Sequence, residues 1–102
     1  MHKLVALLLL LPFAQIALAE RTFPDVAKRG EWTSSQYPYV TISGKRHQLA
    51  PGVRVYDKDN RVLLPTMYPS RASVAYQEDF AGNILKIWLL TTDEQRSFDR
   101  KK

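Results

Sequence analysis

The sequence predicts an all-β fold: a small closed or half-open barrel of five to six strands, of OB or SH3-like size. Short apolar stretches alternate with turn residues, and no stretch has the long apolar period of an amphipathic helix. Cysteine is absent, so a closed sheet and aromatic side chains must stabilise the domain without disulfides. Because an open sheet of this size would leave unprotected edges, a barrel is favoured over the alternative, a two-layer sandwich.

The first residues are typical of a secretory signal peptide. A basic start, Met1-His2-Lys3, precedes an apolar run over residues 4–11, and Ala17-Leu18-Ala19 has the small-x-small pattern of a cleavage site,. The run is shorter than the roughly 20 residues that a membrane-spanning helix needs. We therefore expect residues 1–19 to be removed. The remaining chain should be soluble, periplasmic or otherwise exported, and without stable membrane insertion.

After cleavage, three segments are expected. Residues 20–29 contain Pro24 and mixed charges without a clean period, which is typical of a flexible N-terminal arm,. Residues 30–91 form the barrel, and residues 92–102 a polar C-terminal tail. The segments with strand character, in order, are 30–33, 39–42, 46–49, 53–56, 62–64, 72–77 and 84–90.

Alternation within these segments predicts which side chains face the core. We expect the strands to follow one another around the barrel as an all-β meander. The side chains expected inside it are Trp32, Val40, Ile42, His47, Leu49, Val53, Val55, Val74, Tyr76, Leu85, Ile87 and Leu89. Residues 34–36 are expected to loop, and Pro51-Gly52 should bend the chain. Residues 53–64 form a central hairpin, and residues 66–71 carry the chain across one end of the sheet.

The tail begins with a weak helix signal. Thr91 with Glu94, or Thr92 with Gln95, fits a capping box, in which a hydroxyl and a carboxylate or amide satisfy two backbone N–H groups,. One exposed helical turn is expected.

No set of residues predicts catalysis, a cofactor or a metal site. His47 is the only histidine after residue 19 and shares a face with Leu49, so it is interpreted as a structural, partly buried ring,. Asp57-Lys58-Asp59-Asn60 resembles the start of a calcium loop. The pattern fails because Arg61, Val62 and Tyr68 stand where an EF-hand needs an oxygen ligand, glycine and glutamate,. The segment is better interpreted as a hairpin turn.

Aromatic and basic residues interleave along the predicted strands. They either fill the core and cover strand edges or form a surface that binds a ligand, as on other small barrels. Tyr39, Arg54 and Tyr56 are expected to face outward and form the candidate binding face. The chain is formally +5, which favours an anionic partner. Phospholipid head groups, cell-wall polymers or an acidic protein are then more plausible than nucleic acid for an exported chain, although the charge also serves solubility. The absence of cysteine excludes thiol catalysis, cysteine metal sites and a lipoprotein anchor.

Several motifs together resemble a known family. They are a strand ending in Val40-Thr41-Ile42-Ser43-Gly44, the stretch Leu49-Ala50-Pro51-Gly52-Val53-Arg54-Val55-Tyr56-Asp57, Val74-Ala75-Tyr76 and Ile87-Trp88-Leu89-Leu90. With the signal peptide, this arrangement resembles the small exported accessory protein of type IV pilus biogenesis. The resemblance implies a non-enzymatic periplasmic role in fimbrium assembly, with minor pilins or the large tip adhesin PilY as partners. It brings no catalytic residues. The alternative is a periplasmic barrel that binds cell-wall glycan or anionic lipid.

Overall fold

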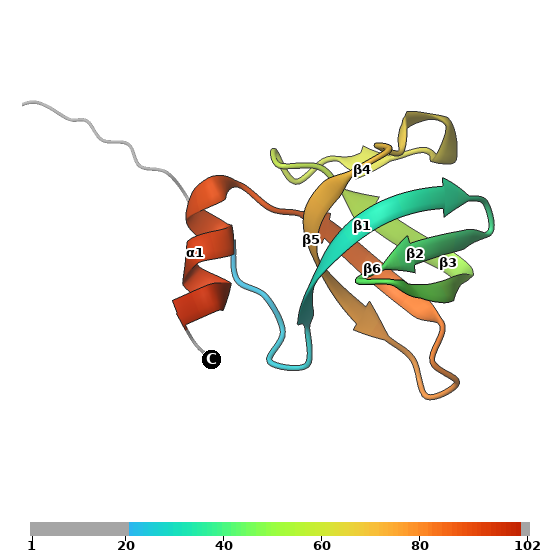
Figure 1. The fold of residues 1–102 in the computed structure, drawn as a ribbon, viewed down its shortest axis with the longest axis horizontal. Helices are drawn as coiled ribbons and strands as arrows, with labels where there is room; N and C mark the ends of the chain where they lie inside the picture. Colours follow the sequence, from blue (N-terminus) through green and yellow to red (C-terminus); the bar gives the residue numbers. More distant parts are fainter. Residues whose placement is uncertain (1–20, 101–102) are drawn as a thin grey trace, which may run out of the picture.

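The computed structural model describes residues 21–100, and Figure 1 shows a small barrel with a helix beside it. The elements, in order, are β1 (Lys28–Gln36), β2 (Tyr39–Ile42), β3 (Lys45–Tyr56), β4 (Val62–Leu63), the 3₁₀ turn η2 (Pro65–Met67), β5 (Ala72–Glu78), β6 (Ile84–Leu89) and α1 (Thr92–Arg100). The predicted signal peptide and its cleavage site lie outside the described residues. No helix within residues 21–100 is long and apolar enough to cross a membrane.

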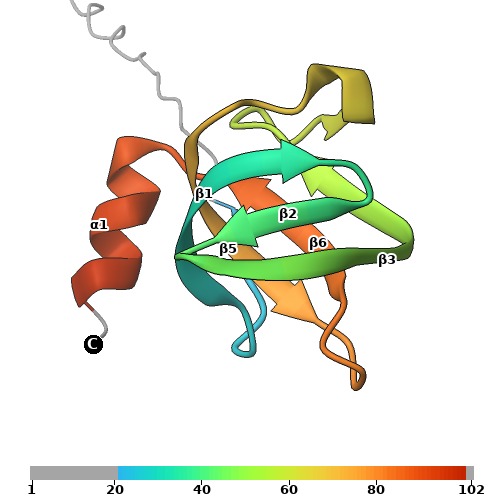
Figure 2. The same cartoon turned by 45° about the vertical axis from the view of Figure 1, so that its right-hand side comes forward.

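Five strands close into a ring, which confirms the predicted barrel and removes the sandwich alternative. Around the ring the neighbours are β1, β2, β3, β6 and β5, and β5 pairs with β1 again. Figure 2 shows β1, β2 and β3 side by side in front of β5 and β6. The expectation of a simple meander is wrong, because β3 and β6 are distant in sequence and pair in parallel. A parallel contact between the third and last strands of the ring is the connectivity of OB-type barrels, a likeness of topology that carries no function by itself.

β3 is one continuous strand where the sequence predicts two. Pro51-Gly52 does not end it, because Gly52 adopts a positive φ of 79° and absorbs the bend as a bulge,. The register against β6 moves from Leu49↔Ile84 to Arg54↔Lys86 across this bulge. β1 also exceeds its predicted length, since residues 34–36 pair with β2 and do not loop.

β6 corrects one predicted core residue. Ile84, fully buried, occupies the barrel interior that the alternation assigns to Leu85, which is only half-buried. The cause is a register shift against β5: Gln77 pairs with Lys86 and Glu78 with Ile84. Leu85 is thereby left between two pairs, and the alternation resumes at Ile87.

Two apolar clusters stabilise the structure, one inside the barrel and one outside it. The interior cluster contains Trp32, Val40, Ile42, Leu49, Val55, Val74, Tyr76, Ile84, Ile87 and Leu89. The outer cluster contains Ala75, Trp88 and Leu90, against which Phe23, Ala27, Tyr56 and Phe98 pack. Phe23 and Ala27 belong to the segment before β1, and Phe98 belongs to α1. The ends of the described chain therefore form a second layer on the outer face of β5 and β6.

Two hairpin loops are closed in the same way, by an aspartate carboxylate that accepts two backbone hydrogen bonds. In the loop after β3, the Asp57 carboxylate accepts hydrogen bonds from the backbone N–H groups of Asp59 and Arg61, both at 2.9 Å. In the loop after β5, Asp79 accepts the equivalent bonds from Ala81 and Asn83, also at 2.9 Å. This use of Asp57 confirms the turn interpretation of its segment.

Candidate functional site

The structure divides the predicted binding face into two places. Tyr39 lies on β2 opposite Gln48, at the start of β3, whereas Arg54 and Tyr56 lie near the end of β3. All three side chains point out of the barrel, as predicted, and they are exposed or half-buried. Five residues of β3 lie between Gln48 and Arg54, so Tyr39 and Tyr56 belong to different patches.

The Tyr39 patch is a single cation–π contact. The guanidinium of Arg46 lies 4.0 Å from the centre of the Tyr39 ring, on the outer face of β2 and β3. At an exposed position such a contact contributes about 0.5–1 kcal/mol. The Tyr39 ring is therefore already covered by a side chain of its own domain.

The Tyr56 patch continues into a stack of three aromatic rings. Tyr56 and Trp88 lie in register on β3 and β6, with ring centroids 6.1 Å apart and planes 14° from parallel. Phe23 contacts the Trp88 ring edge-on at 5.5 Å. Trp88 is only 7% exposed, so it forms a rigid support behind the half-buried Tyr56 ring.

A pocket of about 340 Å³ opens beside this stack, near the lower end of small-molecule sites. Strands β3 and β6, the hairpin loop after β3 and the segment before β1 contribute its lining: Arg21, Thr22, Pro24, Tyr56, Asn60, Lys86 and Trp88. Two of these residues are cationic and none is acidic. Arg54 lies directly beside Lys86 in the sheet, and within residues 21–100 neither has a carboxylate partner.

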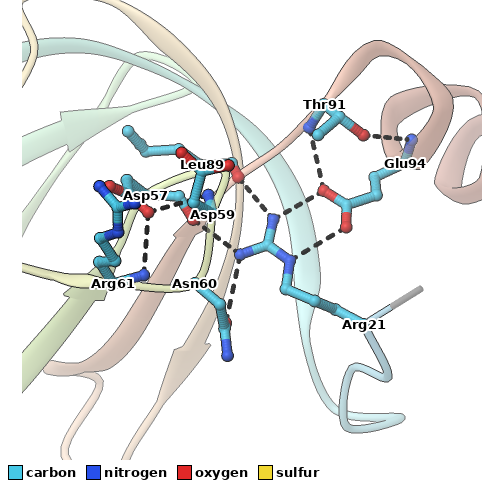
Figure 3. A network of polar contacts seen from close by, with 8 residues as sticks. All are labelled: Arg21, Asp57, Asp59, Asn60, Arg61, Leu89, Thr91 and Glu94. Carbon is cyan, nitrogen blue, oxygen red and sulfur yellow. Dashed lines mark hydrogen bonds and ion pairs between the residues drawn. The ribbon is translucent and has the colours of Figure 1, made fainter. Parts of the chain in front are cut away.

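Arg21 holds the wall of this pocket in place and was not identified from the sequence. Its guanidinium donates to both oxygens of Glu94, at 2.7 and 3.0 Å, and to the carbonyls of Leu89, at 2.7 Å, and Asp57, at 2.8 Å (Figure 3). The side-chain oxygen of Asn60 accepts a longer bond at 3.4 Å. One residue therefore joins the predicted flexible arm to β6, α1 and the hairpin loop. No local pattern could reveal these contacts, because their partners lie 36 to 73 residues away.

Glu94 combines this ion pair with the start of α1. Thr91 and Glu94 exchange the two bonds of a capping box: the Thr91 N–H donates to Glu94 Oε1 at 2.9 Å, and the Glu94 N–H donates to Thr91 Oγ1 at 3.2 Å. The first of the two predicted boxes is thus confirmed, although α1 spans nine residues and not one turn,. Burial alone would raise the pKa of Glu94. The bonds from Arg21 and Thr91 outweigh it, and the pKa is lowered,.

His47 is 6% exposed and faces the barrel interior, which confirms the predicted buried ring. Its Nδ1 lies 3.4 Å from a Glu78 oxygen, and Lys28 Nζ binds the other Glu78 oxygen at 3.0 Å. Burial lowers the pKa of His47, and Glu78 opposes this only partly,. The imidazole is therefore held mainly neutral near pH 7, as a packing residue beside Tyr76.

Exposed apolar side chains gather along β4 and η2. Val62, Leu64 and Met67 are 51%, 62% and 53% exposed; we call these three residues the β4–η2 strip. β4 pairs only with β3 and is the one described strand with an unpaired edge. Val62 lies beside Tyr56 in the register, so the strip borders the pocket. Three exposed apolar side chains close together in sequence, beside an unpaired strand edge, offer a surface that a partner could cover.

A second, larger groove of about 650 Å³ separates the segment before β1 from α1. Its lining mixes the basic Arg21 and Arg100 with the acidic Asp25, Asp93 and Glu94, so it favours neither sign of charge. Within residues 21–100 no group of three or more His, Asp or Glu side chains could hold a metal ion.

Comparison with known proteins identifies no relative: no protein-family model, curated protein or solved structure matches the chain.

Proposed function

We propose that this chain is a non-enzymatic, exported accessory protein that assists type IV pilus assembly by binding other pilus proteins in the periplasm. The observation that carries protein binding is the β4–η2 strip. Burying three half-exposed apolar side chains against a partner is favourable by roughly 25 cal/mol per Å² of apolar surface. The open edge of β4 beside them offers backbone groups to the same partner. The pilus assignment is supported by the sequence resemblance alone.

Capture of pilus components tests the proposal. The exported protein, used as bait in a periplasmic extract, should retain minor pilins or the tip adhesin, identified by mass spectrometry. Leu64→Asp and Met67→Asp should each reduce this capture at least tenfold, because a charge in an apolar contact is strongly unfavourable. Phe80→Asp is the matched control, since Phe80 is a fully exposed apolar residue outside the strip.

Two results would overturn the proposal. The first is equal capture by the strip variants and the Phe80 control. The second is normal piliation and twitching motility in a strain that lacks the gene.

A second candidate function is binding of a cell-wall glycan, and the pocket beside Tyr56 favours it. That pocket offers an aromatic ring, hydroxyl and amide groups and a cation in one small volume. The protein should then co-sediment with purified sacculi. Co-sedimentation with anionic lipid vesicles and not with sacculi would instead indicate a membrane surface.

A further inference from the structure

We infer that the pocket formed by Thr22, Tyr56, Asn60, Lys86 and Trp88 is a subsite for one sugar ring bearing a carboxylate. The inference rests on the second candidate function and specifies its site and ligand chemistry. It is independent of protein binding at the β4–η2 strip.

The aromatic stack supplies the platform for a sugar. A pyranose has an apolar C–H face that packs flat on an aromatic ring, and aromatic rings that line small pockets commonly provide such contacts. Tyr56 is half-buried, and Trp88 supports one of its faces at 14° from parallel. Because Phe23 fixes Trp88 from another side, little side-chain entropy remains to be lost on binding.

Polar groups at the pocket rim suit the hydroxyls of a sugar. The Asn60 side-chain oxygen is held by Arg21 at 3.4 Å, and Figure 3 shows the amide nitrogen pointing away from Arg21. No acceptor within residues 21–100 takes a bond from that nitrogen, so it can donate to a ligand,. Thr22 follows Arg21 in the sequence and is exposed. Its hydroxyl lines the pocket and can both donate and accept a hydrogen bond.

Charge selects an acidic sugar over a neutral one. Lys86 lines the pocket and Arg54 lies beside it in the sheet, and neither is paired with a carboxylate of residues 21–100. The other cation, Arg21, is neutralised by Glu94 and fully engaged. Lys86 is thus the group that would meet a carboxylate of the ligand, and Arg54 adds a longer-range attraction.

The larger groove beside α1 does not share these properties. Its lining mixes three acidic residues with two basic ones, and Arg21 is already paired with Glu94. The groove therefore offers an anionic ligand no excess of positive charge, and the smaller pocket is the better anion site despite its size.

Two matched tetrasaccharides test the subsite. One alternates N-acetylglucosamine with N-acetylmuramic acid, which carries a lactyl carboxylate; the other is chitotetraose, which lacks it. Calorimetry on the exported protein should show at least tenfold tighter binding of the acidic tetrasaccharide. A difference of this size is what one additional charge-assisted hydrogen bond is expected to contribute. In ¹H–¹⁵N spectra the indole N–H of Trp88 should shift, while that of the buried Trp32 should not.

Variants locate the effect. Lys86→Gln should remove the preference for the acidic sugar, and Lys86→Arg should restore most of it. Lys45→Gln, an exposed lysine at the start of β3, should leave the preference unchanged. Because Lys86 is exposed, its variants should fold. Tyr56→Leu should weaken the binding of both tetrasaccharides, and its thermal transition checks that it is folded.

Equal affinity for the two sugars, or an unchanged preference in Lys86→Gln, would overturn the subsite. Inorganic phosphate that competes as strongly as the tetrasaccharide would show an anion site without sugar recognition and would overturn it too. If the protein sediments with sacculi while these tests fail, only the subsite is wrong. If neither sacculi nor the tetrasaccharide binds, the second candidate function fails with it.

Discussion

At the scale of single residues, Arg21 is the side chain on which most of the outer layer depends. Its three nitrogens meet the acceptors of three separate segments, and a guanidinium can satisfy such an arrangement because its donors are fixed in a plane. Lysine could reach one acceptor but not all of them. Thr22 and Pro24, which line the pocket, follow Arg21 closely in the sequence. The ion pair between Arg21 and Glu94 therefore fixes the position of this wall of the pocket.

Acid should therefore loosen the outer layer through Glu94. The pKa of Glu94 is lowered from its ordinary value of 4.5. Its ionised form thus contributes its full stabilisation above about pH 4.5, and this is lost as the pH falls through the lowered pKa. Glu94→Gln should lower stability at pH 7 by about 1–3 kcal/mol and flatten the acid dependence. The indole N–H signal of Trp88, followed as a function of pH in both proteins, measures this acid dependence.

The neighbouring Asp93 provides the control for this prediction. Asp93 lies in the first turn of the same helix, its side chain is 91% exposed, and within residues 21–100 its one ion pair is with Arg96 at the surface. Asp93→Asn should therefore change little. Burial of His47 also makes the protein less stable as the pH falls below 6.5,. That effect belongs to the barrel and is common to both variants. Identical acid profiles for Glu94→Gln and the parent would contradict the assignment.

At the scale of elements, the two Asp-closed loops explain why the hairpins hold their register. Each carboxylate satisfies two backbone N–H groups that would otherwise be unpaired in the turn,. Each loop also contains a residue at positive φ, Asn60 at 67° and Gly82 at 87°, as three-residue hairpin turns with a bulge require.

Removing these carboxylates should destabilise the domain measurably. We expect Asp57→Ala and Asp79→Ala each to lower the free energy of unfolding by about 1–2 kcal/mol. Asp57→Ala should cost more, because loosening its loop also displaces the backbone carbonyl of Asp57, which accepts a bond from Arg21 and which alanine retains. Asp59→Ala, in an exposed part of the same loop, is the matched control and should stay within about 0.5 kcal/mol of the parent. Urea unfolding compares them, and equal losses in Asp57→Ala and Asp59→Ala would refute the turn mechanism.

At the scale of the whole molecule, sequence patterns predicted the barrel but not its outer layer. Alternation placed Trp32 and Val55 correctly because strand periodicity is local,. It misplaced Leu85 because the responsible bulge depends on the pairing partner, which no local pattern specifies,. The capping box at Thr91 was visible for the same local reason. Phe23 was set aside with the arm, since its role depends on Trp88, far along the chain.

For the same reason, the candidate binding face was only partly predictable. Tyr56 and Arg54 were identified by their outward position on one strand, which is a local property. Lys86 and Trp88 join them only because β3 and β6 pair in parallel, and a parallel contact between distant strands leaves no short-range signal.

The two layers should also differ in how readily they open. The interior cluster has ten buried residues and the outer cluster three, so the segment before β1 and α1 should open locally at a lower free energy than the barrel. Phe23→Ala should accelerate hydrogen exchange of α1 amides while leaving Val74, in β5, nearly unchanged. Val26→Ala, at a residue 64% exposed in the same segment, should alter neither. Equal acceleration in α1 and β5 would mean that the layers unfold as one unit.

If the outer layer opens separately from the barrel, the two walls of the pocket beside Tyr56 differ in rigidity. The wall on the barrel side is rigid, and the wall on the other side opens with the outer layer. Ligand binding in the pocket should therefore protect the amides of α1 from hydrogen exchange.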